Sequence, residues 1–310
     1  MNFPVSGVQI DPVYLMAVGF VVGILGGFFG VGGSFLAGPA LFSVGVPMNF
    51  VVGTDLAHIV GKSIVAARKH RTLGNIDLKL GLIMVIGTIG GVEVGAQVIQ
   101  LLKRSAYIDS VVGFAFVFIL LGISGFMTWE SVKTLRAQRR ARVSGQPAPT
   151  PGSAGKDVSA VAHIARAVHR ISLPPHISLP VSGIARISIW AIIIVAFVGG
   201  FFSGFLGGGA GYIRMPCMVY LLGIPTHIAV GTDLFEIIIS AGYGTASHAL
   251  KGNVDILIAL VMHTGAAIGA LMGATLTQYF GGPRIRMAFI PLPVIGAIMM
   301  IYGLITGRGH

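Results

Sequence analysis

Apolar residues follow one another along this chain in long runs that are separated by short polar stretches. Each of six runs approaches or exceeds the ~20 apolar residues that a helix needs to cross the hydrocarbon core of a bilayer. Segments this long and this uncharged cannot all be core helices of a soluble protein. The pattern predicts an all-α, polytopic membrane protein, with apolar runs at residues 13–29, 80–102, 111–129, 187–206, 256–280 and 287–305.

Composition agrees with a chain whose surface is mostly covered by lipid. Hydrophobic residues make up 54% of the chain and charged residues only 10%, whereas soluble domains average about 25% charged residues. The 46 glycines favour a tightly packed bundle, because small residues let helices approach closely in a membrane. The single Cys217 excludes an intrachain disulfide and a cysteine metal cluster. No Lys or Arg precedes the first apolar run, so it is expected to be a retained helix and not a cleaved signal peptide.

The net charge of +11 is concentrated in one long polar segment. Nine of the 21 Lys and Arg residues lie between Lys133 and Arg186, so the charge does not indicate a nucleic-acid partner. The run 144–155 is rich in Pro, Ser and Gly, as in a flexible linker, and basic loops near helix ends stay in the cytoplasm. We therefore expect a first transmembrane repeat at 1–129, a basic cytoplasmic linker at 130–183 and a second transmembrane repeat at 184–310.

Within the linker, residues 157–171 carry apolar side chains at helical spacing. They are either an amphipathic helix that lies on anionic lipid or part of a disordered tether with coincidental periodicity.

An internal repeat is the strongest signal in the sequence. Asp55 and Asp233 lie 178 positions apart, and the same shift superimposes many other residues without a gap. Chance similarity between apolar helices would match Leu, Val and Ala, whereas here Asp, Asn, Pro and His match. The duplicated motifs are Gly53-Thr54-Asp55-Leu56 with Gly231-Thr232-Asp233-Leu234, and Gly74-Asn75-Ile76-Asp77 with Gly252-Asn253-Val254-Asp255.

Basic residues predict the orientation of the repeats. The N-terminal tail has no Lys or Arg, whereas Arg68, Lys69 and Arg71 follow one helix, and the basic linker follows two further spans. With the tail outside and the linker inside, the first half crosses the membrane a net odd number of times. The second half then runs upside down, which predicts two inverted-topology repeats of about five helical segments each. This orientation places Lys103 and Arg104 outside the cytoplasm, where the charge rule does not expect basic residues.

Each half contains a glycine-rich break in its first hydrophobic region, at residues 30–34 and 207–211. A short apolar piece with prolines at its ends follows each break, at 39–47 and 216–225, and is too short to span a bilayer. These pieces are expected to be broken or re-entrant hairpins, whose unwound backbone offers N–H groups to an anion. The alternative is close helix packing through small residues. The predicted site glycines are Gly32, Gly33, Gly208 and Gly209.

Ionisable residues follow each short piece at helical spacing. Asp55 and His58 occupy one helix face, which continues to Lys62, and Asp233 and Glu236 occupy the matching face, which continues to Ser240. A carboxylate inside an apolar helix costs several kcal/mol unless it is paired or hydrated, so it is a functional candidate. Asp55, His58, Asp233 and Glu236 are therefore predicted to carry protons or to balance an anion. The alternative for the two aspartates is an N-cap that seals the helix start after Pro47 or Pro225.

Three further polar features have competing interpretations. Arg214, between the second break and Pro216, either contacts the anion or extends to the membrane surface. Glu93 has no acidic counterpart in the second half, and is either an acid on the transport pathway or a partner of Lys62. The two Gly-Asn-x-Asp motifs are expected to be turns followed by N-caps.

No arrangement of residues indicates an enzyme or a bound cofactor. Gly61-Lys62-Ser63 resembles the end of a phosphate-binding loop, but Leu56 stands where that loop needs glycine. Neither a hydrolytic triad nor a dense metal-ligand cluster can be assembled from the sequence.

Four motifs of the first half occur in order: the glycine-rich segment Gly27-Phe28-Phe29-Gly30-Val31-Gly32-Gly33, the Gly45-Val46-Pro47 turn, Gly53-Thr54-Asp55-Leu56 and Arg71-Thr72-Leu73-Gly74-Asn75-Ile76-Asp77. Together they resemble the TauE/SafE family of sulfite exporters. Most of these motifs are duplicated, and the resemblance covers nearly all of both halves. It implies a secondary transporter in the bacterial inner membrane that exports sulfite, sulfoacetate or another organosulfonate.

Such a transporter is expected to be driven by protons or by the membrane potential, with a small anion and lipid as its partners and a homodimer as an open possibility. The anion is expected between the two breaks, near Arg214 and the hydroxyls of Ser34, Thr54 and Thr232. The alternative function is a membrane-embedded accessory or sensor protein that acts through its basic cytoplasmic linker.

Overall fold

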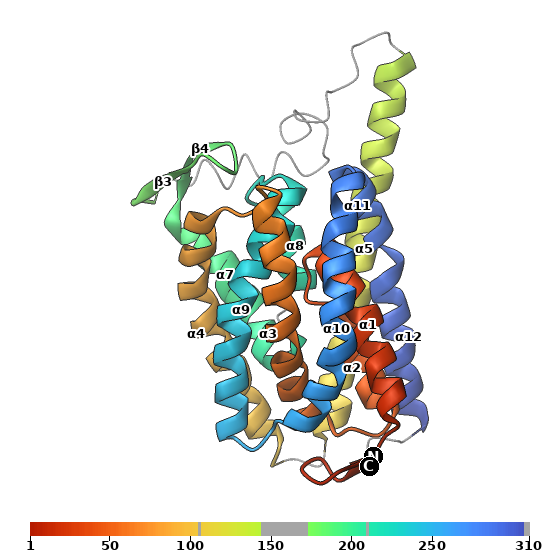
Figure 1. Ribbon diagram of the computed structural model, residues 1–310. Helices are drawn as coiled ribbons and strands as arrows, with labels where there is room; N and C mark the ends of the chain where they lie inside the picture. Colours follow the sequence, from red (N-terminus) through yellow and green to blue (C-terminus); the bar gives the residue numbers. More distant parts are fainter. Residues whose placement is uncertain (105–106, 144–172, 209–210, 307–310) are drawn as a thin grey trace.

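The computed structural model of the protein describes residues 1–104, 107–143, 173–208 and 211–306. Two halves of similar organisation are visible along the chain (Figure 1). The first half contains strands β1 (Asn2–Phe3) and β2 (Val8–Gln9) and helices α1 (Pro12–Phe29), α2 (Ser34–Ser43), α3 (Met48–Thr72), α4 (Leu78–Leu102) and α5 (Ile108–Val143). The second contains β3 (His176–Leu179), β4 (Ile184–Ser188), α7 (Ile189–Leu206), α8 (Gly211–Tyr220), α9 (Thr226–Leu250), α10 (Ile256–Leu276), the 3-10 turn η2 (Thr277–Tyr279), α11 (Gly282–Phe289) and α12 (Pro291–Thr306).

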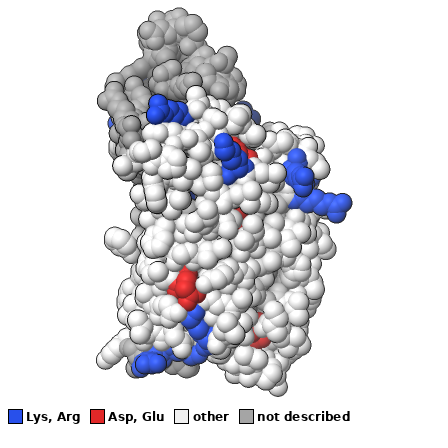
Figure 2. All heavy atoms as spheres, turned by 90° about the vertical axis from the view of Figure 1, so that its left-hand side faces the viewer, with Lys and Arg blue, Asp and Glu red and all other residues white. Residues whose placement is uncertain are grey.

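Among the described residues, seven helical segments are long and apolar enough to cross a membrane. This confirms the prediction of an all-α, polytopic membrane protein. Figure 2 shows one side of the bundle with little charge, with basic side chains gathered toward its two ends and few acidic side chains in view. That distribution suits a protein whose middle contacts lipid and whose ends contact water.

The two halves interlock through their helices. α1 of the first half packs along α10 of the second, α7 of the second packs along α4 of the first, and α3 lies against α9 in the interior. Glycine allows this close approach: a Cβ on Gly269 of α10 would come within 2.9 Å of the Ile24 nitrogen, and a Cβ on Gly91 of α4 within 2.5 Å of the Phe201 nitrogen. Backbone-to-backbone packing of this kind is how membrane helices associate without a hydrophobic driving force.

The helices that follow the two glycine-rich breaks are too short to cross the membrane. α2 and α8 have 10 residues each, about 15 Å at 1.5 Å per residue, against a hydrocarbon core of about 30 Å. They confirm that a broken segment follows each glycine-rich run. They begin earlier than predicted, so Pro39 and Pro216 lie inside the helices and not at their starts. Pro39 has no N–H, so the Phe35 carbonyl lacks its usual hydrogen bond within the helix. Gly296 of α12 packs directly on that carbonyl oxygen.

Asp77 and Asp255 are the N-caps of α4 and α10, as predicted. The Asp77 carboxylate accepts from the Leu80 nitrogen at 3.1 Å, and the Asp255 carboxylate accepts from the Leu257 nitrogen at 3.1 Å. The preceding turns use glycine in the left-handed region, where a Cβ is disfavoured, with φ of 72° at Gly74 and 67° at Gly252.

Each N-cap is also tied to a β-hairpin of the other half. The Ser6 hydroxyl, in the β1–β2 turn, donates to Asp255 Oδ2 at 2.7 Å, and the Ser182 hydroxyl, in the β3–β4 turn, donates to Asp77 Oδ2 at 2.7 Å. The two turns share the sequence Pro-Val-Ser-Gly, at positions 4–7 and 180–183. The duplicated unit therefore includes a hairpin before its first helix.

Regular structure occupies both ends of the segment predicted as a linker, 130–183. α5 continues through Glu130 to Val143, and an ordered hairpin begins at His176. Pro, Ser and Gly in the turn at 180–183 have the composition of a linker, but here they form a tight turn. Residues 157–171, with the predicted amphipathic helix, lie outside the described residues.

Candidate functional site

The two glycine-rich breaks meet in the interior of the protein. Gly30, Gly32 and Gly33 have φ of 73°, 68° and 77°, and Gly207 and Gly208 have φ of 82° and 77°. Residues with a Cβ rarely adopt these angles. A Cβ on Gly32 would come within 2.9 Å of the Gly208 carbonyl oxygen, so the two breaks are in direct contact.

Each break also packs on the helix of the opposite half that carries an acidic face. A Cβ on Gly30 would lie 2.5 Å from the Val230 Cα of α9, and one on Gly207 would lie 3.0 Å from the Val52 Cα of α3. Gly211, the first residue of α8, lies against both Val31 and the Asp233 carboxylate. Irregular backbone, a buried carboxylate and the start of α8 thus converge. The side chain of Ser34 and the whole of Gly209 lie outside the described structure.

The acidic face of α9 is paired with an arginine from the short helix. Arg214 donates through Nε to Asp233 Oδ1, and its Nη2 lies 2.6 Å from Glu236 Oε2. All three side chains have 0% exposed area. The Ser240 hydroxyl donates to Glu236 at 3.2 Å, and Arg214 Nη1 lies 3.4 Å from the Thr88 hydroxyl of α4. The interpretation of Arg214 as an arginine that extends to the membrane surface is therefore wrong.

The polar face of α3 forms a second buried cluster. His58 Nδ1 lies 3.4 Å from Asp55 Oδ1 and 3.4 Å from Lys62 Nζ. All three side chains are buried, with 1% exposure each. This confirms the predicted helix face. The N-cap alternative for the two aspartates is wrong, because α3 begins at Met48 and α9 at Thr226, and each aspartate lies about two turns inside its helix.

The short helix α8 binds the acids of α9 and carries a residue that interacts with the α3 cluster. Tyr212 is fully buried and close enough to Asp55 to interact with it electrostatically, while Arg214, two residues on, binds the acids of α9. The sequence interpretation did not single out Tyr212; its signal is a polar aromatic side chain two positions before a buried arginine in an otherwise apolar helix. α8 therefore joins the two acidic faces.

Several polar atoms of these clusters have no hydrogen-bond partner among the described residues. They are Asp55 Oδ2, His58 Nε2, Tyr212 Oη, Asp233 Oδ2 and Glu236 Oε1. Buried polar groups are normally paired, so unsatisfied atoms that gather beside two glycine breaks point to a ligand, ion or proton that these groups serve.

The hydroxyl oxygens of Thr54 and Thr232 are engaged elsewhere. Thr54 Oγ1 accepts from the Asp255 nitrogen at 2.9 Å, and Thr232 Oγ1 accepts from the Asp77 nitrogen at 2.9 Å. Each threonine connects its helix to the N-cap of a helix in the other half. In the described structure, the Gly-Thr-Asp-Leu motif thus combines a structural threonine with an acid in a buried cluster.

Glu93 lies apart from both clusters, on the boundary between α4 and α9. Its carboxylate accepts from the Ser247 hydroxyl at 2.6 Å, from Gln97 at 2.6 Å and from Tyr243 at 3.1 Å. It also pairs with Lys251 at 3.1 Å. The alternative that paired Glu93 with Lys62 is therefore wrong, because α9 brings Lys251 to the carboxylate. No group of three or more potential metal ligands occurs among the described residues.

Comparison with known proteins adds a family to this geometry. The sequence model of "Sulfite exporter TauE/SafE" matches residues 15–300. The chain is 26% identical over 304 residues to the probable membrane transporter protein YunE of Bacillus subtilis, covering 95% of this chain and 99% of that protein. It is 24% identical to the probable membrane transporter protein YjnA of the same organism, covering 94% and 98%. A probable membrane transporter protein of Methanocaldococcus jannaschii is 40% identical over 74 residues, 22% of this chain and 28% of that protein. No solved structure gives a significant match.

Proposed function

The chain belongs to the sulfite exporter TauE/SafE family and is a membrane transporter, and we propose that it exports a small oxyanion across the bacterial plasma membrane. Sulfite, sulfoacetate and other organosulfonates are the proposed substrates. The observation that carries this proposal is the contact of two glycine breaks between two buried clusters, each of which contains a cation. Backbone without a Cβ lets an anion approach N–H groups closely, and the buried cations supply charge.

Charge balance in the buried clusters supports proton coupling. Three carboxylates, Asp55, Asp233 and Glu236, are accompanied by two cations, Lys62 and Arg214. An unbalanced buried charge is costly, so the cluster favours uptake of one proton, and entry of an anion increases that demand. Anion export also gains from an inside-negative potential, at about 2.3 kcal/mol per charge for each 100 mV.

Both clusters are closed to solvent, because their charged side chains have 0–1% exposure. Transport then requires a movement that exposes them to one side at a time. We assign this movement to α8, since α8 holds Arg214 and Tyr212 and is too short to be anchored at both membrane surfaces.

Proteoliposome flux tests both substrate and coupling. Wild-type protein is expected to carry sulfite or sulfoacetate and to respond to an imposed pH gradient. Glu236→Gln leaves two carboxylates and two cations, so we expect it to retain anion exchange but to lose the response to the gradient. Glu93→Gln, outside the clusters, is the matched control and should keep the response. A gradient response in Glu236→Gln equal to that of wild type would contradict the proton role.

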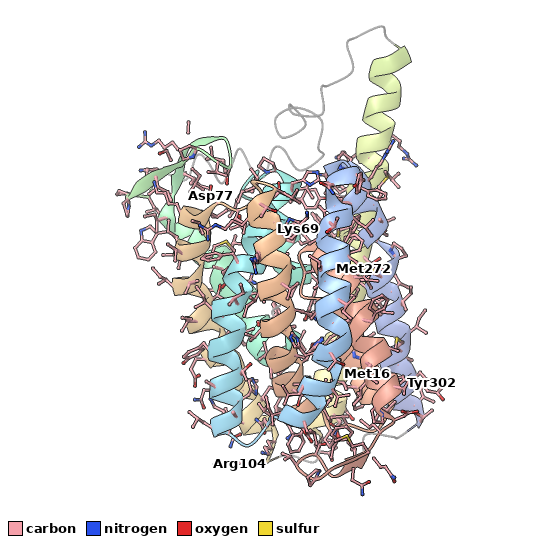
Figure 3. The ribbon with its side chains drawn as sticks, viewed as in Figure 1. Met16, Lys69, Asp77, Arg104, Met272 and Tyr302 are labelled. Carbon is pink, nitrogen blue, oxygen red and sulfur yellow. The ribbon has the colours of Figure 1, made fainter. Side chains whose placement is uncertain are left out.

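We further propose that the two halves are inverted-topology repeats, with the N-terminus outside and the linker in the cytoplasm. The reciprocal ties support this arrangement, as does Figure 3, in which Lys69 and Asp77 lie at the end opposite to Arg104. The N-terminus and the β3–β4 hairpin likewise lie at opposite ends (Figure 1). Lys103, which opposes the charge rule, has a structural role: its Nζ donates to the Lys251 carbonyl at 3.2 Å, at the C-terminal end of α9.

Cysteine labelling tests the topology at two equivalent turns. Val5 and Val181 occupy the same position in the two Pro-Val-Ser-Gly turns and are 54% and 50% exposed. In a Cys217→Ala background, Val5→Cys should react with an impermeant maleimide in intact cells, and Val181→Cys only after permeabilisation. The reverse pattern would contradict the orientation, and labelling of both in intact cells would contradict the inversion.

A further inference from the structure

Lys62 differs from Arg214 in how its charge is balanced. Arg214 has two carboxylates in contact, whereas Lys62, equally buried, has no carboxylate within 4.0 Å among the described residues. Its one hydrogen-bond contact there is His58 Nδ1 at 3.4 Å. An ammonium has three donors. The Lys62 side chain therefore has unused donors and no carboxylate in direct contact among the described residues.

His58 cannot serve both of its neighbours at once. Its Nδ1 lies 3.4 Å from Asp55 Oδ1 and from Lys62 Nζ, but one ring nitrogen either donates a proton or accepts one. With a proton on Nδ1, His58 donates to the Asp55 carboxylate, and the Lys62 ammonium keeps no partner among the described groups. With Nδ1 bare, Lys62 donates to it and the carboxylate loses its donor. Ionised Asp55 therefore favours the arrangement that releases Lys62.

Other polar atoms on and around this helix face also lack a hydrogen-bond partner in the part of the chain that the structure describes. Tyr212 Oη and His58 Nε2 have no partner among the described residues. The His263 ring of α10 packs on α3 beside Lys62: a Cβ on Gly61 would lie 2.7 Å from His263 Nδ1, and that nitrogen also lacks a partner. Two titratable groups from other helices interact with this face: Tyr212 with Asp55, and His263 with Lys62.

We propose that Lys62 provides the positive charge that binds the transported oxyanion. His58 is a positioning residue that keeps Lys62 available by pairing with Asp55. The second half has no equivalent of this group, because Ser240 stands 178 positions after Lys62, so the chain binds one anion through one lysine. This inference rests on the proposed function and assigns the ligand-binding cation within it.

The test compares variants that remove the charge with one that keeps it. Asp55→Asn/Lys62→Met removes both charges and so leaves no uncompensated carboxylate. We expect its KM for sulfite or sulfoacetate, whichever the wild type carries, to rise about 10- to 100-fold, as for loss of a hydrogen bond to a charged group. The stabilisation of the purified protein by the same anion, measured as a thermal shift, should disappear. Lys62→Arg should keep KM within a few fold of the wild-type value and should keep the thermal shift.

Lys79→Met is the control, because it removes an exposed lysine that donates to the Ser178 carbonyl at 2.9 Å; its KM should match wild type. A folded Asp55→Asn/Lys62→Met protein with wild-type KM and thermal shift would overturn the inference while leaving the proposed function intact. Wild-type protein with neither flux nor thermal shift would overturn both.

The positioning role of His58 has a separate readout. His58→Ala lets Asp55 pair directly with Lys62, which lies on the same helix face, and should raise KM without a matching fall in kcat. Adding Asp55→Asn should restore KM, since no carboxylate then competes with the anion. Failure of the second substitution to restore KM would overturn the positioning role.

Discussion

Replacing Arg214 with methionine is expected to remove most of the folded protein. The substitution leaves Asp233 and Glu236 buried at 0% exposure without their cation. Breaking a buried ion pair by removing one partner costs about 3–5 kcal/mol, which is a large part of the stability of a typical protein. The measurement is the amount of monodisperse protein after extraction in detergent, together with the midpoint of thermal unfolding.

A charge-balanced variant separates lost pairing from lost packing. Arg214→Met/Asp233→Asn/Glu236→Gln contains no unpaired charge in this cluster and should recover most of the folded yield, although it should not transport. Arg284→Met, on the exposed side of α11, controls for the loss of an arginine and should behave as wild type. Wild-type yield and midpoint in Arg214→Met would contradict the ion-pair geometry.

Gly91→Leu is expected to separate α4 from α7. A Cβ at this position would come within 2.5 Å of the Phe201 nitrogen, and the rest of a leucine side chain would require the two backbones to move apart. Overpacking a well-packed contact costs about 1–3 kcal/mol or more, and here it also breaks the contact between the two halves. We expect a lower unfolding midpoint and a smaller monodisperse fraction.

Gly125→Leu is the matched control. A Cβ on Gly125 of α5 meets no atom within 4 Å, so a leucine there has space, and it replaces glycine with a better helix former. Its unfolding midpoint should equal or exceed that of wild type. A similar loss of stability in Gly91→Leu and Gly125→Leu would show that helix packing at Gly91 is not the cause.

Local features of the fold could be predicted because their signals are local. Apolar runs of membrane-spanning length, glycines that need left-handed backbone and aspartates that cap a helix each act through neighbouring residues. Six of the seven candidate spans among the described residues, the short helices after the two breaks and the N-caps at Asp77 and Asp255 were accordingly predictable. The seventh span, α3, was not among the predicted apolar runs, because polar residues interrupt it. The face that joins Asp55, His58 and Lys62 followed from helix periodicity alone.

Some structural detail was hidden because composition does not distinguish a turn from a tether. The Pro-Val-Ser-Gly sequence at 180–183 lies in a segment rich in turn residues, and its match at 4–7 is short. Its order depends on the Ser182 hydroxyl and the Asp77 carboxylate, which lie 105 positions apart in the chain. A contact of that range gives no periodic signal in the sequence.

The sequence by itself determined that this protein is a bundle of membrane helices with a duplicated pattern of breaks and buried acids, because helix periodicity and apolar run length carry that information. Only the tertiary structure decided which groups meet: that Arg214 of α8 pairs with Asp233 and Glu236, that Glu93 pairs with Lys251 and not with Lys62, and that Thr54 and Thr232 tie the halves together. The physical reason is that these partners belong to different helices. Their approach depends on how closely the glycine-lined backbones pack, and no spacing along the chain records that distance.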